Sequence, residues 1–302
     1  MLVRASEAIS LIDTEALGSP RIVAAYLVTG KEKALVDMGY SSSYPTIIQD
    51  LKRAGIADDG LDYLLPTHVH LDHCGSCGRL ADIFPSASVR THPIGVPHLL
   101  DPTRLLNSAK QLFGDELIRK YGEPRPIENK RVLAIADDEM ITMGRGLTLR
   151  SIWTPGHASH HLSFVLEGTG MVITGDAVGI HYPDFPVLIP TTPPPSFHLE
   201  QAIASIERIL NLSPSRLLTP HFGIVVDPEK WLADNVRTLH QWRNELGNLT
   251  TKGYSLDETI EAFLGEVSDQ AGRSVNDMPE HIRISIRLSV LGFTRFLKSR
   301  VS

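Results

Sequence analysis

The hydrophobic positions along the first ninety residues change period, and their order predicts a mixed α/β protein. Three short apolar runs within residues 8–39 are separated by turns, which is the pattern of antiparallel strands. Residues 44–55 follow with helical spacing and end at Gly55, a usual helix stop. The segment 60–92 then reads as a strand, a helix closed by Pro85 and another strand.

The middle of the chain breaks this alternation. Residues 93 to about 131 hold five prolines around a helical stretch, 104–122, and we predict a helical insertion there. Strand patterns return after residue 131, and residues 161–176 read as a hairpin with glycines in its turn. Residues 181–196 are rich in proline and are predicted to form a long loop, a kind of loop that often serves a function.

The last third is mainly helical. Residues 197–212 have the spacing of an amphipathic helix, and 215–221 read as a strand. After Asp227 the pattern is helical to the end of the sequence. With 302 residues the chain is long for one core and short for two, so we expect one main domain, 1–226, and an α-helical C-terminal extension, 227–302.

Composition narrows the class of protein. No apolar run approaches the roughly 20 residues that span a bilayer, and the start of the chain lacks the apolar region of a signal peptide, so we expect a cytoplasmic protein without a membrane partner. The net charge of −6 argues against nucleic acid as a partner.

Cys74 and Cys77 are too few for a disulfide framework. Their C-x-x-C spacing allows a redox or zinc pair, although packing is the commoner role.

Four of the predicted strands end on side chains that can bind a metal. Most of them do so through a short turn of threonine, proline and glycine. Functional groups in α/β sheets gather beyond the carboxyl ends of strands, so we expect these side chains to meet. The strand ends carry His68 and His70 in "THVHLDH", His157 in "TPGH", Asp176 in "TGD" and His221 in "TPH".

The spacing within this set indicates two ion sites. Residues i and i+2 of an extended segment face the same way, so His68 and His70 can bind one ion, and His157 would complete three imidazoles around it. Imidazole and carboxylate ligands suit Zn(II), Fe(II) or Mn(II), and the sequence does not choose among them. Each ion would keep an open position, as catalytic metals do.

The second predicted site uses the residues where the strand turns into a helix. Asp72 and His73 point away from the first site and can hold a second ion together with His221. Asp176 has two carboxylate oxygens and can bridge the two ions. The structural alternative is that all of these residues are ordinary core or surface groups, and the full set of five histidines and two aspartates argues against it.

The order of these motifs resembles the metallo-β-lactamase-fold superfamily over roughly residues 5–226. The resemblance implies an αββα sandwich with the metal site at one edge. It also implies that Asp37, in "ALVDMG", orients a ligand without binding metal itself. Within the superfamily the chain is similar to the glyoxalase II-like branch, which shares every ligand. In length and layout it resembles the quinolone-signal-pathway thioesterases of the 2-aminobenzoylacetyl-CoA type.

This resemblance implies a dinuclear metallohydrolase that cleaves a thioester, ester or lactone of a small molecule. A hydroxide shared by two divalent ions, with zinc favoured over iron or manganese, would attack the carbonyl, and Asp72 would accept the proton of the attacking water. Two alternatives stay open. One is a mononuclear iron dioxygenase acting on sulfur compounds, and the other is a regulatory protein that binds a ligand with vestigial hydrolysis. The sequence also leaves open whether the chain forms a homodimer.

Residues near the ligands have further predicted roles. Of His160 and His161, one is expected to hydrogen-bond near the site and the other to be exposed. His181 or Tyr182, in the proline-rich segment, would donate to the substrate carbonyl, or the loop packs its own aromatic side chains. Five apolar residues would line an acyl pocket or belong to the core: Leu105, Leu106, Phe113, Phe185 and Phe197.

Overall fold

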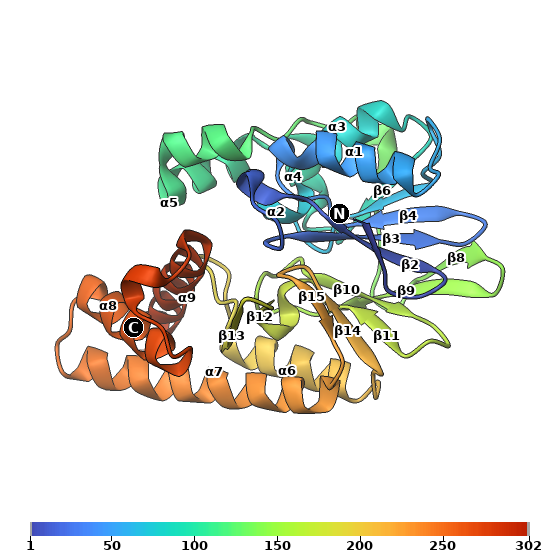
Figure 1. Ribbon diagram of the computed structural model, residues 1–302. Helices are drawn as coiled ribbons and strands as arrows, with labels where there is room; N and C mark the ends of the chain where they lie inside the picture. Colours follow the sequence, from blue (N-terminus) through green and yellow to red (C-terminus); the bar gives the residue numbers. More distant parts are fainter. Residues whose placement is uncertain (1, 301–302) are drawn as a thin grey trace.

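A computed structural model describes residues 2–300 of the chain, with the side chain of His181 outside the described part. Two β-sheets pack face to face, and helices cover the outer face of each sheet (Figure 1). This arrangement is an αββα sandwich, so the predicted fold class is confirmed. In Figure 1 α1 and α3 lie above one sheet, while α6 and α7 lie beneath the other.

The first sheet has seven strands whose spatial order follows the sequence. Strands β1 to β4 are antiparallel, as the alternating pattern of the first forty residues predicts, whereas β4 to β7 are parallel. Parallel neighbours need crossover connections, and the helices between these strands supply them. The strands are β1 (Leu2–Arg4), β2 (Ile9–Asp13), β3 (Ala24–Thr29), β4 (Lys33–Val36), β5 (Tyr63–Leu65), β6 (Ser88–Thr91) and β7 (Val132–Ala134).

The second sheet has six strands in the order β15-β14-β11-β10-β9-β8. The predicted hairpin of residues 161–176 is present as β10 and β11, and β11 pairs parallel with β14. The strands are β8 (Met140–Gly144), β9 (Leu147–Trp153), β10 (Leu162–Leu166), β11 (Met171–Ile173), β14 (Arg216–Thr219) and β15 (Gly223–Val225).

The proline-rich segment departs from the prediction of a long loop. Its first half forms a separate two-stranded sheet, β12 (Ile180–Tyr182) and β13 (Phe185–Ile189), and only residues 190–198 run without regular structure. The apolar side chains of β13 account for the difference, because Phe185 and Ile189 are fully buried in the core and need an extended backbone to reach it.

The helices lie where the sequence patterns place them. The predicted insertion consists of two helices, α4 and α5, and α5 has a non-helical break at Gly114 (φ 78°). The helices are α1 (Tyr44–Arg53), α2 (Leu71–Cys74), α3 (Cys77–Ile83), α4 (Val96–Leu100), α5 (Thr103–Tyr121), α6 (Leu199–Leu210), α7 (Pro228–Thr251), α8 (Leu256–Gln270) and α9 (Glu280–Ser299).

The hydrophobic core is continuous from the sheets into the C-terminal helices. Phe164 of the second sheet, Trp242 of α7, Phe263 of α8 and Phe293 of α9 belong to one buried cluster. A second cluster lies between the first sheet and its covering helices, and it contains both cysteines as free, buried thiols. The boundary between a domain 1–226 and an extension therefore stays a prediction. No helix in the described chain is long and apolar enough to cross a membrane.

Candidate metal centre

The predicted ligands converge at one edge of the sandwich, because each follows the carboxyl end of a strand by a few residues. His68 follows β5, His157 follows β9, and His221 follows β14. Asp176 lies in a short 3-10 helix, Gly175–Val178, directly after β11. All four of these side chains are at least nine-tenths buried. Segments far apart in the sequence thus deliver buried imidazoles and a carboxylate to one point.

Three imidazole nitrogens form the first group of candidate ligands. His68 Nε2 lies 2.9 Å from His70 Nδ1, and His157 Nε2 lies 3.1 Å from the first and 2.9 Å from the second. Ligands of a tetrahedral zinc ion with bonds of about 2.0–2.1 Å would lie about 3.3 Å apart. The three nitrogens already approach that separation, so this cluster fits one ion with little rearrangement.

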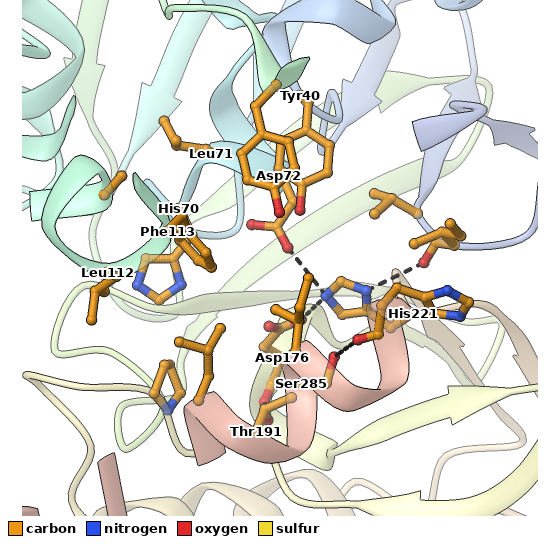
Figure 2. A pocket seen from close by; sticks show the side chains of 18 of the residues that line it. Tyr40, His70, Leu71, Asp72, Leu112, Phe113, Asp176, Thr191, His221 and Ser285 are labelled. Carbon is orange, nitrogen blue, oxygen red and sulfur yellow. Dashed lines mark hydrogen bonds and ion pairs between the residues drawn. The ribbon is translucent and has the colours of Figure 1, made fainter. Parts of the chain in front are cut away.

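A second group lies beside the first. The ligand atoms of Asp72, His73 and His221 lie within 4.8 Å of one another, as do those of His68, His73 and Asp176. His221 Nε2 is 3.5 Å from a carboxylate oxygen of Asp72, which is the only partly exposed member of the group, at 23%. Figure 2 shows Asp72, His221 and Asp176 pointing toward one another at the floor of the cavity.

The two oxygens of Asp176 face different groups. Oδ1 lies 3.4 Å from His73 Nε2 and 3.5 Å from His221 Nε2, whereas Oδ2 lies 3.5 Å from His157 Nε2. Within the described residues, Asp176 Oδ1 and His73 Nε2 are buried without a hydrogen-bond partner. Buried polar atoms are normally paired, so two orphans that face each other fit an ion placed between them.

Hydrogen bonds on the far side of the His157 and His73 rings aim the other nitrogen of each ring at the centre. His157 Nδ1 donates to the carbonyl oxygen of Thr191 at 3.1 Å, and His73 Nδ1 donates to Asp37 Oδ2 at 3.0 Å. The other oxygen of Asp37 accepts from the backbone N–H of Thr67 at 2.8 Å. Asp37 is fully buried, so its contacts match the orienting role that the resemblance implies.

The electrostatics of the cluster favour a bound cation. Burial lowers the pKa of His70 to about 3 and that of His157 to about 4, so both rings are neutral at pH 7 and keep a lone pair for a metal. Burial alone would lower the pKa of His73, but the carboxylates of Asp176 and Asp72 outweigh it and raise that pKa well above its usual value. The acidic half of the site thus favours positive charge, which a divalent ion would supply.

The expectation that one of His160 and His161 is exposed needs correction. Neither His160 nor His161 is exposed, because they retain only 8% and 0% of their accessible surface. The ring that hydrogen-bonds at the site is that of His161, whose Nε2 accepts from the backbone N–H of Asp176 at 2.9 Å. His160 lines the cavity instead. Adjacent histidines on irregular backbone look alike in the sequence, and only the fold decides which ring turns inward.

Tyr182 contacts a predicted ligand. Its hydroxyl lies 3.3 Å from His221 Nδ1. His181 belongs to β12, and its side chain lies outside the described residues. No pattern in the sequence pointed to Thr191, whose hydroxyl donates to the carbonyl oxygen of Asp176 at 2.5 Å.

A cavity of about 1310 Å³ opens above the cluster. Helix α5 contributes Leu105 and Phe113 to its wall, as the interpretation of an acyl pocket expects, but Leu106 does not line it. Phe185 and Phe197 are also absent from the wall because they are buried in the main core. The rest of the apolar wall, which the sequence did not indicate, includes Leu112 and Leu117 of α5 and Ile284 and Leu288 of α9.

Comparison with known proteins identifies the family. The sequence model of the metallo-β-lactamase superfamily matches residues 18–221, and this range includes every candidate ligand. The chain belongs to the metallo-β-lactamase superfamily. A metallo-β-lactamase fold-containing protein of Sulfurisphaera tokodaii is 30% identical over 214 residues, which cover 68% of this chain and 75% of that protein.

Two solved structures are similar to this chain in fold, and a further relative is similar to it in sequence. The crystal structure of an archaeal superfamily protein from Sulfolobus tokodaii has a TM-score of 0.70 and 25% identity, covering 95% of this chain and 98% of that one. A metallo-β-lactamase family protein from Thermus thermophilus shares the fold, with a TM-score of 0.67 and 21% identity over 99% and 95% of the chains. An atrochrysone carboxyl ACP thioesterase of Aspergillus fumigatus is 29% identical over 153 residues, 50% of this chain and 38% of that protein.

Proposed function

We propose that this superfamily member is a metal-dependent hydrolase that cleaves a thioester, ester or lactone of a small molecule. It would use two divalent metal ions, with zinc as the first candidate. The observation that carries the proposal is the pair of adjacent ligand groups at the floor of the cavity, with one Asp176 oxygen facing each. His68, His70 and His157 would hold one ion, and Asp72, His73 and His221 the other. Imidazole and carboxylate donors are what zinc, iron and manganese accept.

When bound, the ions supply Lewis acidity, which lowers the pKa of water toward neutrality and polarises a carbonyl group. The residues of the chain would accept the proton and orient the ligands. Asp72 is partly exposed to the cavity, and its carboxylate can accept the proton of the attacking water. Asp37 and Thr191 hold His73 and His157 in the tautomers that face the centre. No serine or cysteine nucleophile is required, and both cysteines are buried away from the cavity.

The cavity supports a small-molecule substrate with an apolar part. Pockets of about 300–1,000 Å³ enclose drug-sized ligands, and this one is larger. Its leucine-rich walls come from α5 and α9, so the predicted insertion and the C-terminal helices both shape it. An acyl group fits such walls, and the similarity to a protein named as a thioesterase agrees with a thioester substrate. We also propose that the chain belongs to the glyoxalase II-like branch of the superfamily. Its layout would then be that of the quinolone-signal-pathway thioesterases.

Metal content and hydrolysis measured on the same preparation test the proposal. The protein is purified without added metal, its metals are counted by mass spectrometry, and release of thiol from acetyl- and hexanoyl-thioesters is followed. About two ions per chain with turnover that a chelator abolishes supports the hydrolase. One iron per chain, oxygen uptake on a persulfide and no hydrolysis would replace it by the sulfur dioxygenase. Full metal content without either reaction would favour the ligand-binding regulator.

Replacing Asp176 with Asn tests the assignment of the bridging residue. The variant keeps the size of the side chain but removes its charge, so we expect metal content to fall from about two ions to one or fewer and hydrolysis to fall at least about 100-fold. Asp257→Asn, on the exposed surface of α8, is the control that should change neither. Unchanged metal content and hydrolysis in the Asp176 variant would show that this carboxylate does not bridge.

A further inference from the structure

Two histidines outside the ligand set line the cavity beside the candidate metal centre. His160 follows His157 by three residues, and His98 lies on α4 of the predicted insertion. The ring centroid of His160 is 6.2 Å from that of His68 and 6.3 Å from that of His70. Its distance from the ring centroid of His98 is 6.4 Å. His160 is thus a neighbour of both the first group of candidate ligands and the insertion.

Each of these two rings has a buried nitrogen without a hydrogen-bond partner among the described residues. The atoms are His160 Nε2 and His98 Nδ1. The side chain of His160 is also more than nine-tenths buried. Buried polar atoms are normally paired, and an unpaired one costs free energy that an apolar side chain in the same place would not. Packing alone therefore accounts for neither imidazole.

The two rings are close enough to share one oxygen atom. Hydrogen bonds of about 2.9 Å on each side allow a single oxygen to bridge two imidazoles whose centroids are 6.4 Å apart. The χ2 torsion of histidine is broad, so either ring can turn a nitrogen toward an oxygen in the cavity. The unpartnered nitrogens lose no hydrogen bond when they turn.

The charge state of the rings favours a neutral oxygen as their ligand. Burial lowers the pKa of His160 to about 3, and burial also lowers the pKa of His98. Two neutral imidazoles each offer one N–H donor and bring no positive charge. An oxo group accepts hydrogen bonds without carrying a charge, so it matches this pair of rings.

We propose, resting on the hydrolase function above, that His160 and His98 are specificity-determining residues that bind an oxo oxygen on the acyl part of the substrate. The reacting carbonyl would lie at the candidate ligands, and the second oxygen would lie between the two rings. Because His160 is a neighbour of His68 and His70, one short acyl chain can reach both places. The substrate class is therefore an oxoacyl thioester or ester, and the insertion takes part in selecting it through α4.

A series of thioesters that differ only in the position of one oxo group tests the proposal. Hexanoyl thioester is compared with its 3-oxo, 4-oxo and 5-oxo forms on the protein with its metals, and kcat/KM is measured for each. We expect one oxo position to raise kcat/KM about 10-fold or more over the hexanoyl thioester. The reason is that the substrate without the oxo group leaves buried polar atoms of the site unpaired.

Two pairs of variants separate recognition of the oxo group from packing. His160→Leu and His98→Leu remove the donors, and each should abolish most of the preference while hydrolysis of the hexanoyl thioester changes little. His160→Gln and His98→Asn return an amide N–H near the lost nitrogen, so they should restore part of the preference. His240→Leu, on the exposed surface of α7, is the control that should change neither rate. Metal content should stay at the wild-type value in all five variants.

The other outcomes overturn the inference. Equal kcat/KM across the series, or a preference that survives both leucine variants, would mean that these rings do not bind the acyl chain. Loss of metal from His160→Leu would mean that this ring supports the ligands instead. Arg104 also lines the cavity, so a larger gain for the adipoyl thioester that Arg104→Gln abolishes would assign this wall to a carboxylate. In each case the wild-type protein still hydrolyses the hexanoyl thioester, so the proposed function stands.

Binding of the product acids separates this inference from the proposed function. Isothermal titration calorimetry compares hexanoate with the three oxohexanoates on the wild-type protein and on His160→Leu. If no thioester or ester is hydrolysed but one oxo acid binds more tightly to the wild-type protein alone, the proposed function fails and the binding site for the oxo group remains. Equal binding of all four acids without any hydrolysis would contradict both.

Discussion

At the scale of single residues, Asp37 holds the His73 ring so that Nε2 faces the candidate metal centre. One of its oxygens accepts from the ring of His73, and the other accepts from the backbone N–H and hydroxyl of Thr67. Asp37 has a left-handed φ of 55°, a conformation that Asn also tolerates. The Asp37→Asn variant therefore keeps the backbone and changes only the pattern of donors and acceptors.

We expect Asp37→Asn to weaken metal binding about 10–100-fold, the usual cost of losing a group that orients a ligand. An amide has one acceptor oxygen and cannot serve both Thr67 and His73. If its NH₂ group faces His73, the proton of that ring moves to Nε2 and points at the ion. Competition with a chelating dye measures the affinity, with Asp257→Asn as the control. Equal affinity in the two variants would mean that Asp37 only supports the backbone.

At the scale of elements, α9 is connected to the candidate centre through the segment after β13. Ser289 of α9 donates to the carbonyl oxygen of Pro190 at 2.6 Å, and Thr192 donates to the carbonyl oxygen of Ser289 at 2.7 Å. The adjacent Thr191 holds both His157 and Asp176. Hydrogen bonds thus connect a C-terminal helix with the segment that contacts two predicted ligands.

Gly292→Ala tests this connection. A Cβ atom at Gly292 would clash with the carbonyl oxygen of Thr192, so α9 and the segment must move apart. We expect a loss of about 1–3 kcal/mol in the free energy of unfolding, as for overpacking, together with weaker metal binding. The control is Gly265→Ala in α8, where a Cβ meets nothing within 4 Å and should stabilise the helix by about 0.5–1 kcal/mol. Thermal unfolding measures the change in stability, and chelator competition measures the change in metal affinity. Unchanged metal affinity in Gly292→Ala would show that the position of α9 does not affect the candidate ligands.

At the scale of the whole molecule, the continuous core predicts that residues 1–226 do not fold alone. Leu239 and Trp242 of α7 and Ile286 of α9 are buried in the same cluster as the second sheet, so truncation would expose that face to water. We expect the fragment 1–226 to show no cooperative thermal transition in circular dichroism and to bind no metal with wild-type affinity. A cooperative transition with normal metal content would establish residues 227–302 as a separate extension, as the sequence pattern predicts.

The amino-acid sequence alone was enough to predict the type and order of most elements and the set of candidate ligands. This was possible because the signals are local: the periods of the strands and helices, the i, i+2 spacing of His68 and His70, and the turns that end four strands on His or Asp. The resemblance carried by the sequence also predicted Asp37, which the structure places in contact with His73.

The folded chain was needed to find the contacts between segments that no local pattern connects. It places His161 and not His160 at Asp176, buries Phe185 in the core instead of the expected pocket, and stacks Tyr40 on Tyr121. It also joins the C-terminal helices to the main core. The physical reason is that burial and packing depend on which surfaces meet across the fold, whereas periodicity and ligand spacing depend only on neighbours along the chain.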